Sequence, residues 1–144
     1  MAEHNALIAA LEVAVGENHV IDAPSEAAAP YLTEWRGAFA PVARVVVQPG
    51  STAEVADVVR IAITHGAAIV PQGGNTGTVG GSAASDPEGQ ILMNLERLAA
   101  VREIDTDNAT MTVEAGCTLA AAQEAAEAAG FYLPIALASR AQCR

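Results

Sequence analysis

Residues 44–70 carry a strand–helix–strand pattern with short connections, and this pattern restricts the chain to few folds. The β-branched run RVVV at 44–47 ends at Pro49-Gly50, and the apolar run AAIV occupies 67–70. Between them, Ser51 and Glu54 have the spacing of a capping box, which starts a helix. Apolar residues then recur along one helix face, at Val55, Val58, Val59, Ala62 and Ile63. The pattern predicts a βαβ unit with parallel strands and a right-handed crossover.

The rest of the chain predicts one helix before this unit, and a hairpin and a helix after it. The expected elements are a helix over 5–15, an irregular lead-in over 16–43, a strand over 90–95, a hairpin of strands 100–104 and 110–115, and a helix from Thr118 to Gly130. We therefore expect an α+β fold, in which a small parallel βαβ layer is followed by the start of an antiparallel sheet with a helix. Residues 1–38 are expected to form a helical and irregular leader, and residues 39–144 the main domain.

The loop after the second strand, PQGGNTGTVGGS at 71–82, is unusually rich in glycine. Its spacing fits neither the dinucleotide fingerprint G-x-G-x-x-G nor the Walker loop, which needs a lysine. Successive N–H groups of such a loop can converge into a nest that binds an anion. The Asn75 amide and the Thr76 and Ser82 hydroxyls could assist it. A long surface turn between two strands explains the glycines equally well, so both interpretations stay open at this point.

Charge argues against several classes of partner. The formal net charge is −10, and all seven cationic side chains are arginines. Nucleic acids and anionic membrane surfaces are bound mainly through clustered lysine and arginine, so neither is an expected partner. The sequence contains no apolar run long enough for a transmembrane helix and no secretory signal, so we expect a cytoplasmic protein.

Histidine and cysteine do not form a recognisable site. His4, His19 and His65 are scattered, and none has metal-ligand spacing with a cysteine or carboxylate. Cys117 and Cys143 do not constitute a disulfide framework. We expect no metal site.

The chain resembles the PCMH-type, or vanillyl-alcohol-oxidase-like, flavoproteins from about residue 31 to residue 143. Three segments carry the resemblance: VVVQPGSTAEVADVVRIA, AIVPQGGNTGTVGGS and VEAGCTLAAAQEAAEAAGFYLP. Within the family it is most similar to the D-2-hydroxyacid dehydrogenases, which include D-lactate and D-2-hydroxyglutarate dehydrogenases and the flavin subunit of glycolate oxidase. The resemblance implies that residues 39–144 are the truncated N-terminal part of an FAD-binding domain.

The resemblance also assigns roles within the loop. It implies that backbone N–H groups hold the FAD pyrophosphate at Gly73, Gly74, Asn75, Thr76 and Gly77, with Gly81 and Ser82 closing the loop. Relatives that attach FAD covalently have a histidine where this sequence has Asn75, so non-covalent FAD is expected. Trp35 and Arg36, in the segment YLTEWRG at 31–37, are expected to pack on the flavin domain. Gln48-Pro49-Gly50 is a weaker candidate for packing near the cofactor.

Departures from the family pattern limit what this chain is expected to do. Ala136 stands where the family usually has an acidic residue, and the chain ends at Arg144, before the family's Ile-Gly-Gly-Asn segment. The cap that supplies the substrate-binding and catalytic groups, and in some members metal ligands, is also missing. We therefore expect an N-terminal fragment of an oxidoreductase that binds FAD, with no catalytic residue of its own and a 2-hydroxyacid substrate only in the complete protein.

Two other classes of function stay open from the sequence. The loop could serve a non-catalytic module that binds another nucleotide or a partner. The chain could also be a subunit that completes its site with a second polypeptide. An unfinished sheet exposes a strand edge, so self-association is possible.

Overall fold

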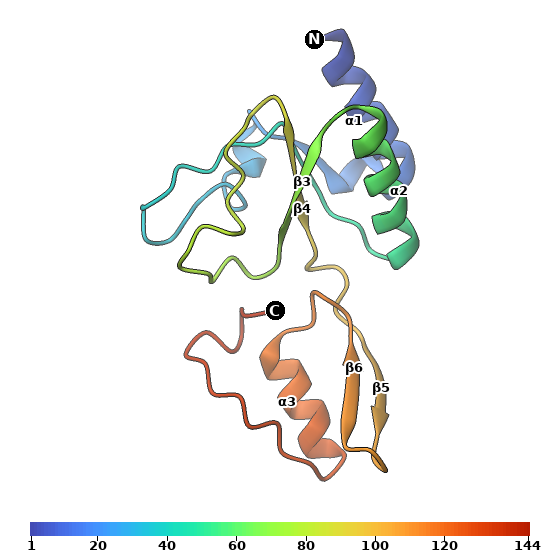
Figure 1. Cartoon of the computed structure of the whole chain (residues 1–144), viewed down its shortest axis with the longest axis vertical. Coiled ribbons are helices and arrows are strands. Elements are labelled where there is room, and N and C mark those ends of the chain that lie inside the picture. Colours follow the sequence, from blue (N-terminus) through green and yellow to red (C-terminus); the bar gives the residue numbers. More distant parts are fainter.

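The structure is a computed structural model that describes residues 1–144. Its helices are α1 (Ala2–Val15), α2 (Thr52–Thr64) and α3 (Leu119–Ala128), with short 3-10 helices η1 (Glu17–His19) and η2 (Glu26–Ala28). Its strands are β1 (Val20–Asp22), β2 (Val45–Val47), β3 (Ala68–Gln72), β4 (Gln90–Asn94), β5 (Val101–Asp105) and β6 (Thr110–Val113). The elements from α1 to β4 form an upper lobe, and β5, β6 and α3 form a lower lobe (Figure 1).

The upper sheet has the order β1-β2-β4-β3, in which β2 and β3 run parallel to β4 and β1 runs antiparallel to β2. The predicted strand–helix–strand unit is therefore parallel, but its two strands are not neighbours because β4 lies between them. Ile91 and Leu92 of β4 are fully buried, which suits a central strand. Pro71 lies on β3 at the sheet edge, where its missing N–H leaves no partner unpaired.

Alternating side chains of the sheet pack into two apolar clusters, one on each face. Val45 and Val47 face α1 and α2, which cover one side of the sheet (Figure 1). Val46 and Leu92 face the other side, where small residues of the leader and the β3–β4 loop pack, among them Ala28 and Ala84. The leader thus contributes to both clusters, and α1 extends over the helix expected at 5–15.

The start of α2 follows its sequence signal closely. The Glu54 N–H donates to Ser51 Oγ at 3.1 Å, as a capping box requires. The Glu54 carboxylate accepts from the Gly50 N–H at 2.7 Å, one residue before the usual partner. Strand β1, of only three residues, lies within the lead-in that was expected to be irregular.

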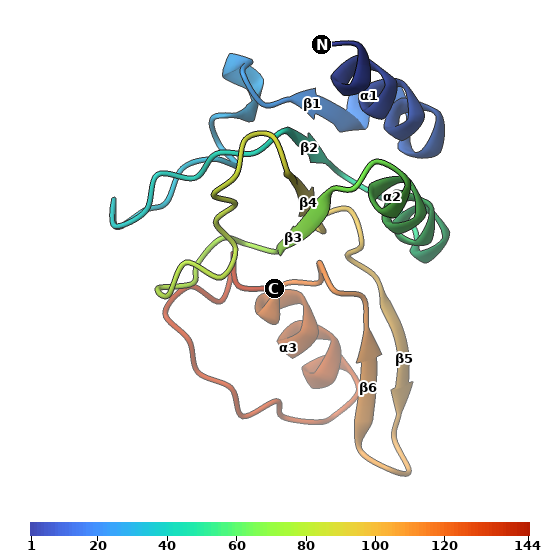
Figure 2. The ribbon, with the colours of Figure 1, turned by 45° about the horizontal axis from the view of Figure 1, so that its top comes forward.

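The lower lobe contains the predicted hairpin and helix. β5 and β6 pair antiparallel, and the Thr118 hydroxyl caps α3 by accepting from the Ala121 N–H at 3.2 Å. Residues 131–144 have no regular structure and run back from the end of α3 toward the upper lobe (Figure 2). At the start of α3, the Leu119 N–H donates to the Cys143 carbonyl at 2.9 Å, so the tail satisfies a free donor of this helix.

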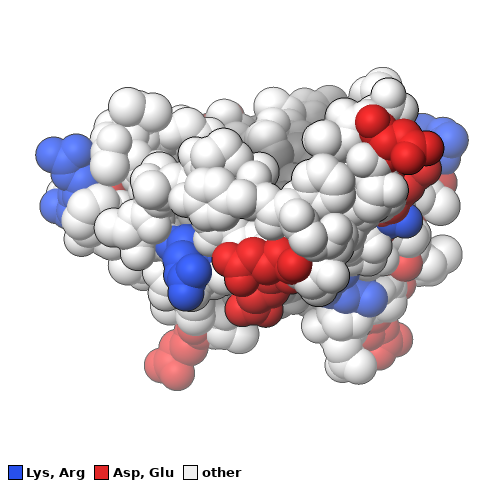
Figure 3. Space-filling model, turned by 90° about the horizontal axis from the view of Figure 1, so that it is seen from below, with Lys and Arg blue, Asp and Glu red and all other residues white.

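These elements confirm the expected α+β class and the incomplete PCMH-type architecture. The division between a leader and a main domain at residue 38 stays a prediction. None of the helices is long and apolar enough to cross a membrane. On the face seen from below, charged side chains lie singly or in small groups among uncharged atoms (Figure 3).

Replacing Leu92 with alanine should lower the free energy of unfolding by about 2–5 kcal/mol, because the change leaves a cavity in the central strand. Ile63→Ala is the matched control, since Ile63 is 74% exposed on α2 and its loss should cost less than about 0.5 kcal/mol. Urea unfolding followed by circular dichroism measures both. Equal effects of the two variants would contradict the assignment of β4 to the core.

Glu114 should make the lower lobe sensitive to acid. The Ala100 N–H and then the Arg102 guanidinium hold the pKa of the Glu114 carboxyl below its ordinary value. Its contribution is therefore present above the pKa of the unfolded chain and is lost as the pH falls through the lower, folded-state pKa. Unfolding midpoints between pH 7 and pH 3 should fall less steeply for Glu114→Gln than for the wild type or for the control Glu124→Gln, which changes an exposed glutamate of α3. An unchanged slope would show that Glu114 makes no such contribution.

Candidate functional site

The glycine-rich loop begins directly at the carboxyl end of β3 and belongs to the long connection that leads to β4. In open α/β sheets, ligands bind outside the carboxyl ends of parallel strands. Both views show this connection and the leader on the same side of the sheet, with the chain's tail next to the loop (Figures 1 and 2). Its position is therefore that of a ligand site.

The backbone of the loop carries a run of free donors. None of the N–H groups from Gly73 to Gly77 donates a hydrogen bond within the protein. Asn75 adopts the left-handed conformation, with φ of 52°. Successive unpaired N–H groups around a left-handed residue are the components of an anion-binding nest.

Two side chains of the loop hold its shape. The Asn75 side-chain amide donates to the Thr33 carbonyl at 2.7 Å, and its carbonyl oxygen accepts from the Ser82 hydroxyl at 2.9 Å. These groups therefore connect the loop to the leader and to its own far end. In this conformation, the free donors of the loop are supplied by the backbone rather than by these two side chains.

Two buried amides below the loop were missed in the sequence analysis. Gln72 and Asn94 end β3 and β4, and each is 2% exposed. The Gln72 amide donates to the Tyr31 carbonyl at 2.9 Å and the Ser82 carbonyl at 3.3 Å, and its oxygen accepts from Asn94 Nδ2 at 3.3 Å. The only signal in the sequence was a polar residue closing each apolar run.

A second polar network lies at the end of β2. The Gln48 amide donates to the Tyr31 hydroxyl and to the Glu96 carboxylate, each at 2.9 Å. Burial, and next the negative charge of Glu96, raise the pKa of the Tyr31 hydroxyl. Gln48 thus connects the leader to the segment after β4. Of the two leader residues expected to pack on the domain, Arg36 donates to the Thr78 carbonyl at 3.5 Å, whereas Trp35 is 65% exposed.

The tail approaches the loop closely at Gly74. A Cβ atom at this position would lie 1.6 Å from the Gln142 carbonyl oxygen, so only glycine fits. A cavity of about 430 Å³ opens between the two segments. Its lining residues are Trp35, Gly74, Asn75, Thr76, Ala138, Ser139 and Gln142. No lining residue is titratable. The predicted cofactor residues that line the cavity are Gly74, Asn75 and Thr76. Those that do not line it are Gly73, Gly77, Gly81 and Ser82.

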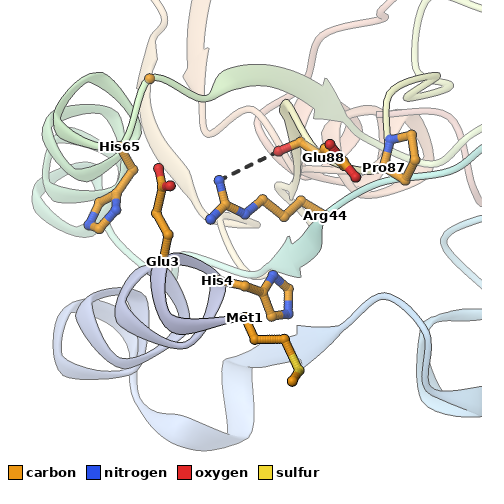
Figure 4. A pocket seen from close by; sticks show the side chains of 8 residues that line it. Met1, Glu3, His4, Arg44, His65, Pro87 and Glu88 are labelled. Atoms are coloured by element: carbon orange, nitrogen blue, oxygen red, sulfur yellow. Dashed lines mark hydrogen bonds between the residues drawn. The ribbon is translucent and has the colours of Figure 1, made fainter.

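A second cavity, of about 460 Å³, lies near the amino ends of the parallel strands, opposite the loop. It is lined by charged and imidazole side chains, including Glu3, His4, Arg44 and His65 (Figure 4). Arg44 donates to the Glu88 carbonyl at 3.5 Å, while His4 turns to Asp22 at 3.1 Å. The groups therefore do not converge on one point, and no three histidine, cysteine or acidic residues lie where they could hold a metal ion.

Comparison with known proteins identifies the family. Residues 43–144 match the family model described as "FAD binding domain". The chain is 36% identical over 113 residues to D-2-hydroxyglutarate dehydrogenase from Xanthomonas citri pv. viticola, which covers 78% of this chain and 24% of that protein. It is 32% identical over 136 residues to the mitochondrial enzyme of Bos taurus, covering 94% and 24%. The chain thus spans about a quarter of the length of these relatives.

Solved structures share the fold. p-Cresol methylhydroxylase with substrate bound superposes with a TM-score of 0.76 over 99% of this chain and 28% of that one, at 22% identity. 4-Ethylphenol oxidase from Gulosibacter chungangensis superposes with a TM-score of 0.73 over 90% of this chain and 25% of that one, at 25% identity. Alkyldihydroxyacetonephosphate synthase superposes with a TM-score of 0.81 over 96% of this chain and 27% of that one, at 17% identity. The resemblance to PCMH-type flavoproteins is therefore confirmed.

The residues of the loop fit such a cofactor. FAD carries a pyrophosphate, for which unpaired backbone N–H groups are suitable ligands. No carboxylate lines the adjoining cavity, so no charge there opposes an anion. This chain belongs to the FAD binding domain family, it is related to D-2-hydroxyglutarate dehydrogenases, and FAD is its cofactor.

Proposed function

We propose that this chain is the part of a flavin-dependent D-2-hydroxyacid dehydrogenase that binds the pyrophosphate of FAD. The observation that carries the proposal is the run of unpaired N–H groups from Gly73 to Gly77 at the carboxyl end of β3. The named relatives, which include D-2-hydroxyglutarate dehydrogenases, support the substrate class.

The loop residues divide into two roles. Gly73, Gly74, Asn75, Thr76 and Gly77 donate backbone N–H groups to the pyrophosphate. Gly81 and Ser82 close the loop, and Ser82 fixes Asn75 through the 2.9 Å hydrogen bond between their side chains. Because an amide forms no bond to the flavin ring, Asn75 leaves the cofactor non-covalent.

Bound FAD would supply the capacity to accept a hydride from a substrate carbon. The residues of this chain contribute binding and orientation rather than proton transfer. A general base must reach the proton that it removes, and none of the side chains lining the cavity beside the loop is titratable. We therefore expect residues 1–144 alone to bind FAD without oxidising a substrate.

Gly77→Pro should weaken FAD binding by about 10- to 100-fold, because it removes one donor to a charged group. Gly77→Ala is the matched control, since a Cβ at this position meets no atom within 4 Å and the N–H is retained. Titration of each variant with FAD, followed by quenching of flavin fluorescence, measures the affinity. Equal affinities of the two variants would contradict binding through the Gly77 N–H.

Denaturation should release all of the flavin. After FAD saturation, acid precipitation should leave the flavin absorbance in the supernatant, and the mass of the protein should be that of the unmodified chain. Flavin that stays with the precipitate would contradict the role of Asn75.

D-2-Hydroxyglutarate or D-lactate oxidation by FAD-saturated residues 1–144, assayed with an artificial electron acceptor, should be undetectable. Turnover would show that a proton acceptor lies within this chain.

A further inference from the structure

Trp35 is the only tryptophan of the chain, and it is 65% exposed although it lines the cavity beside the glycine-rich loop. Burial of a large aromatic side chain normally stabilises the folded protein, and an indole usually contributes strongly to a core or an interface. The sheet core does not use it. Its ring instead borders the same space as Gly74, Asn75 and Thr76.

The backbone around Trp35 is held on both sides. The carbonyl of Thr33 accepts from Asn75 Nδ2 at 2.7 Å, and Arg36 donates to the Thr78 carbonyl at 3.5 Å. Glu34 is 8% exposed, and its carboxylate accepts from the Ala38 N–H at 2.8 Å. The leader therefore fixes Trp35 relative to the loop, and the exposure of the ring does not follow from a loose segment.

Aromatic groups flank the pyrophosphate of FAD, with an adenine on one side and a flavin ring on the other. Both are planar, and stacking of a base on an aromatic side chain is favourable without any hydrogen bond to it. An exposed indole on the wall of an uncharged cavity, carried by a backbone segment that is held in place, is suited to such stacking.

We propose that Trp35 contacts the cofactor by stacking on one of its two aromatic rings. The inference rests on the proposed function, because it requires the pyrophosphate to lie at the loop. It adds a residue outside the loop to the binding site. It also gives the leader a role in binding, because the hydrogen bonds from Asn75 to the Thr33 carbonyl and from Arg36 to the Thr78 carbonyl connect the segment around Trp35 to the loop.

The test compares Trp35→Ala with Trp35→Phe by isothermal titration calorimetry with FAD. Trp35→Ala should weaken FAD binding by about 5- to 150-fold, whereas Trp35→Phe, which keeps an aromatic ring, should stay within a few-fold of the wild type. Urea midpoints of the three proteins should agree, because the ring is mostly outside the core. ADP and FMN then identify the ring: the ligand that contains it should lose affinity in Trp35→Ala, and the other should not.

The outcomes separate this inference from the proposed function. If the wild type binds FAD and Trp35→Ala binds it equally well, the stacking is overturned and the proposed function stands. Equal losses in Trp35→Ala and Trp35→Phe would also overturn stacking, since the aromatic ring would not be what matters. If the wild type, folded and soluble, does not bind FAD, both proposals fail.

Discussion

Gln72 is 2% exposed at the end of β3, and a buried amide without partners costs about 1–3 kcal/mol. Its partners are therefore constraints on the surrounding chain: the leader at Tyr31, the far end of the loop at Ser82, and the neighbouring strand at Asn94. Ser82 in turn fixes Asn75. These contacts fix the path of the loop through side-chain hydrogen bonds, so the backbone N–H groups of the loop remain free for a ligand.

The loop solves an electrostatic problem in an acidic protein. A chain with a net charge of −10 and no lysine repels anions at long range, yet its cofactor carries a pyrophosphate. Short-range dipoles of backbone N–H groups attract an anion at the loop. The Arg144 guanidinium also lies beside Gly74, where a Cβ atom would be 3.2 Å from its Nη1. The tail contributes its close approach at Gly74, which encloses one side of the cavity and links the two lobes.

Local signals made much of the fold predictable. The capping residues Ser51 and Thr118 predicted where α2 and α3 begin, and runs of apolar residues predicted the five strands β2 to β6. These signals are readable because each acts within a few residues. The insertion of β4 between β2 and β3, and the strand β1, depend on pairing between distant segments. The glycines indicated a loop at the carboxyl end of β3, where ligands bind in open α/β sheets. The positions of Gln72, Asn94 and Trp35 beside this loop depend on contacts across the fold, and no spacing in the sequence encodes them.

Amide hydrogen exchange of the loop, measured by mass spectrometry with and without FAD, tests the central claim most directly. Unpaired N–H groups exchange quickly, and a bound pyrophosphate would pair them. Saturating FAD should therefore slow exchange in peptides that cover residues 73–77 and leave the β5–β6 hairpin unchanged. Unchanged exchange at 73–77 in a chain saturated with FAD would contradict the account, because the cofactor would then be held elsewhere.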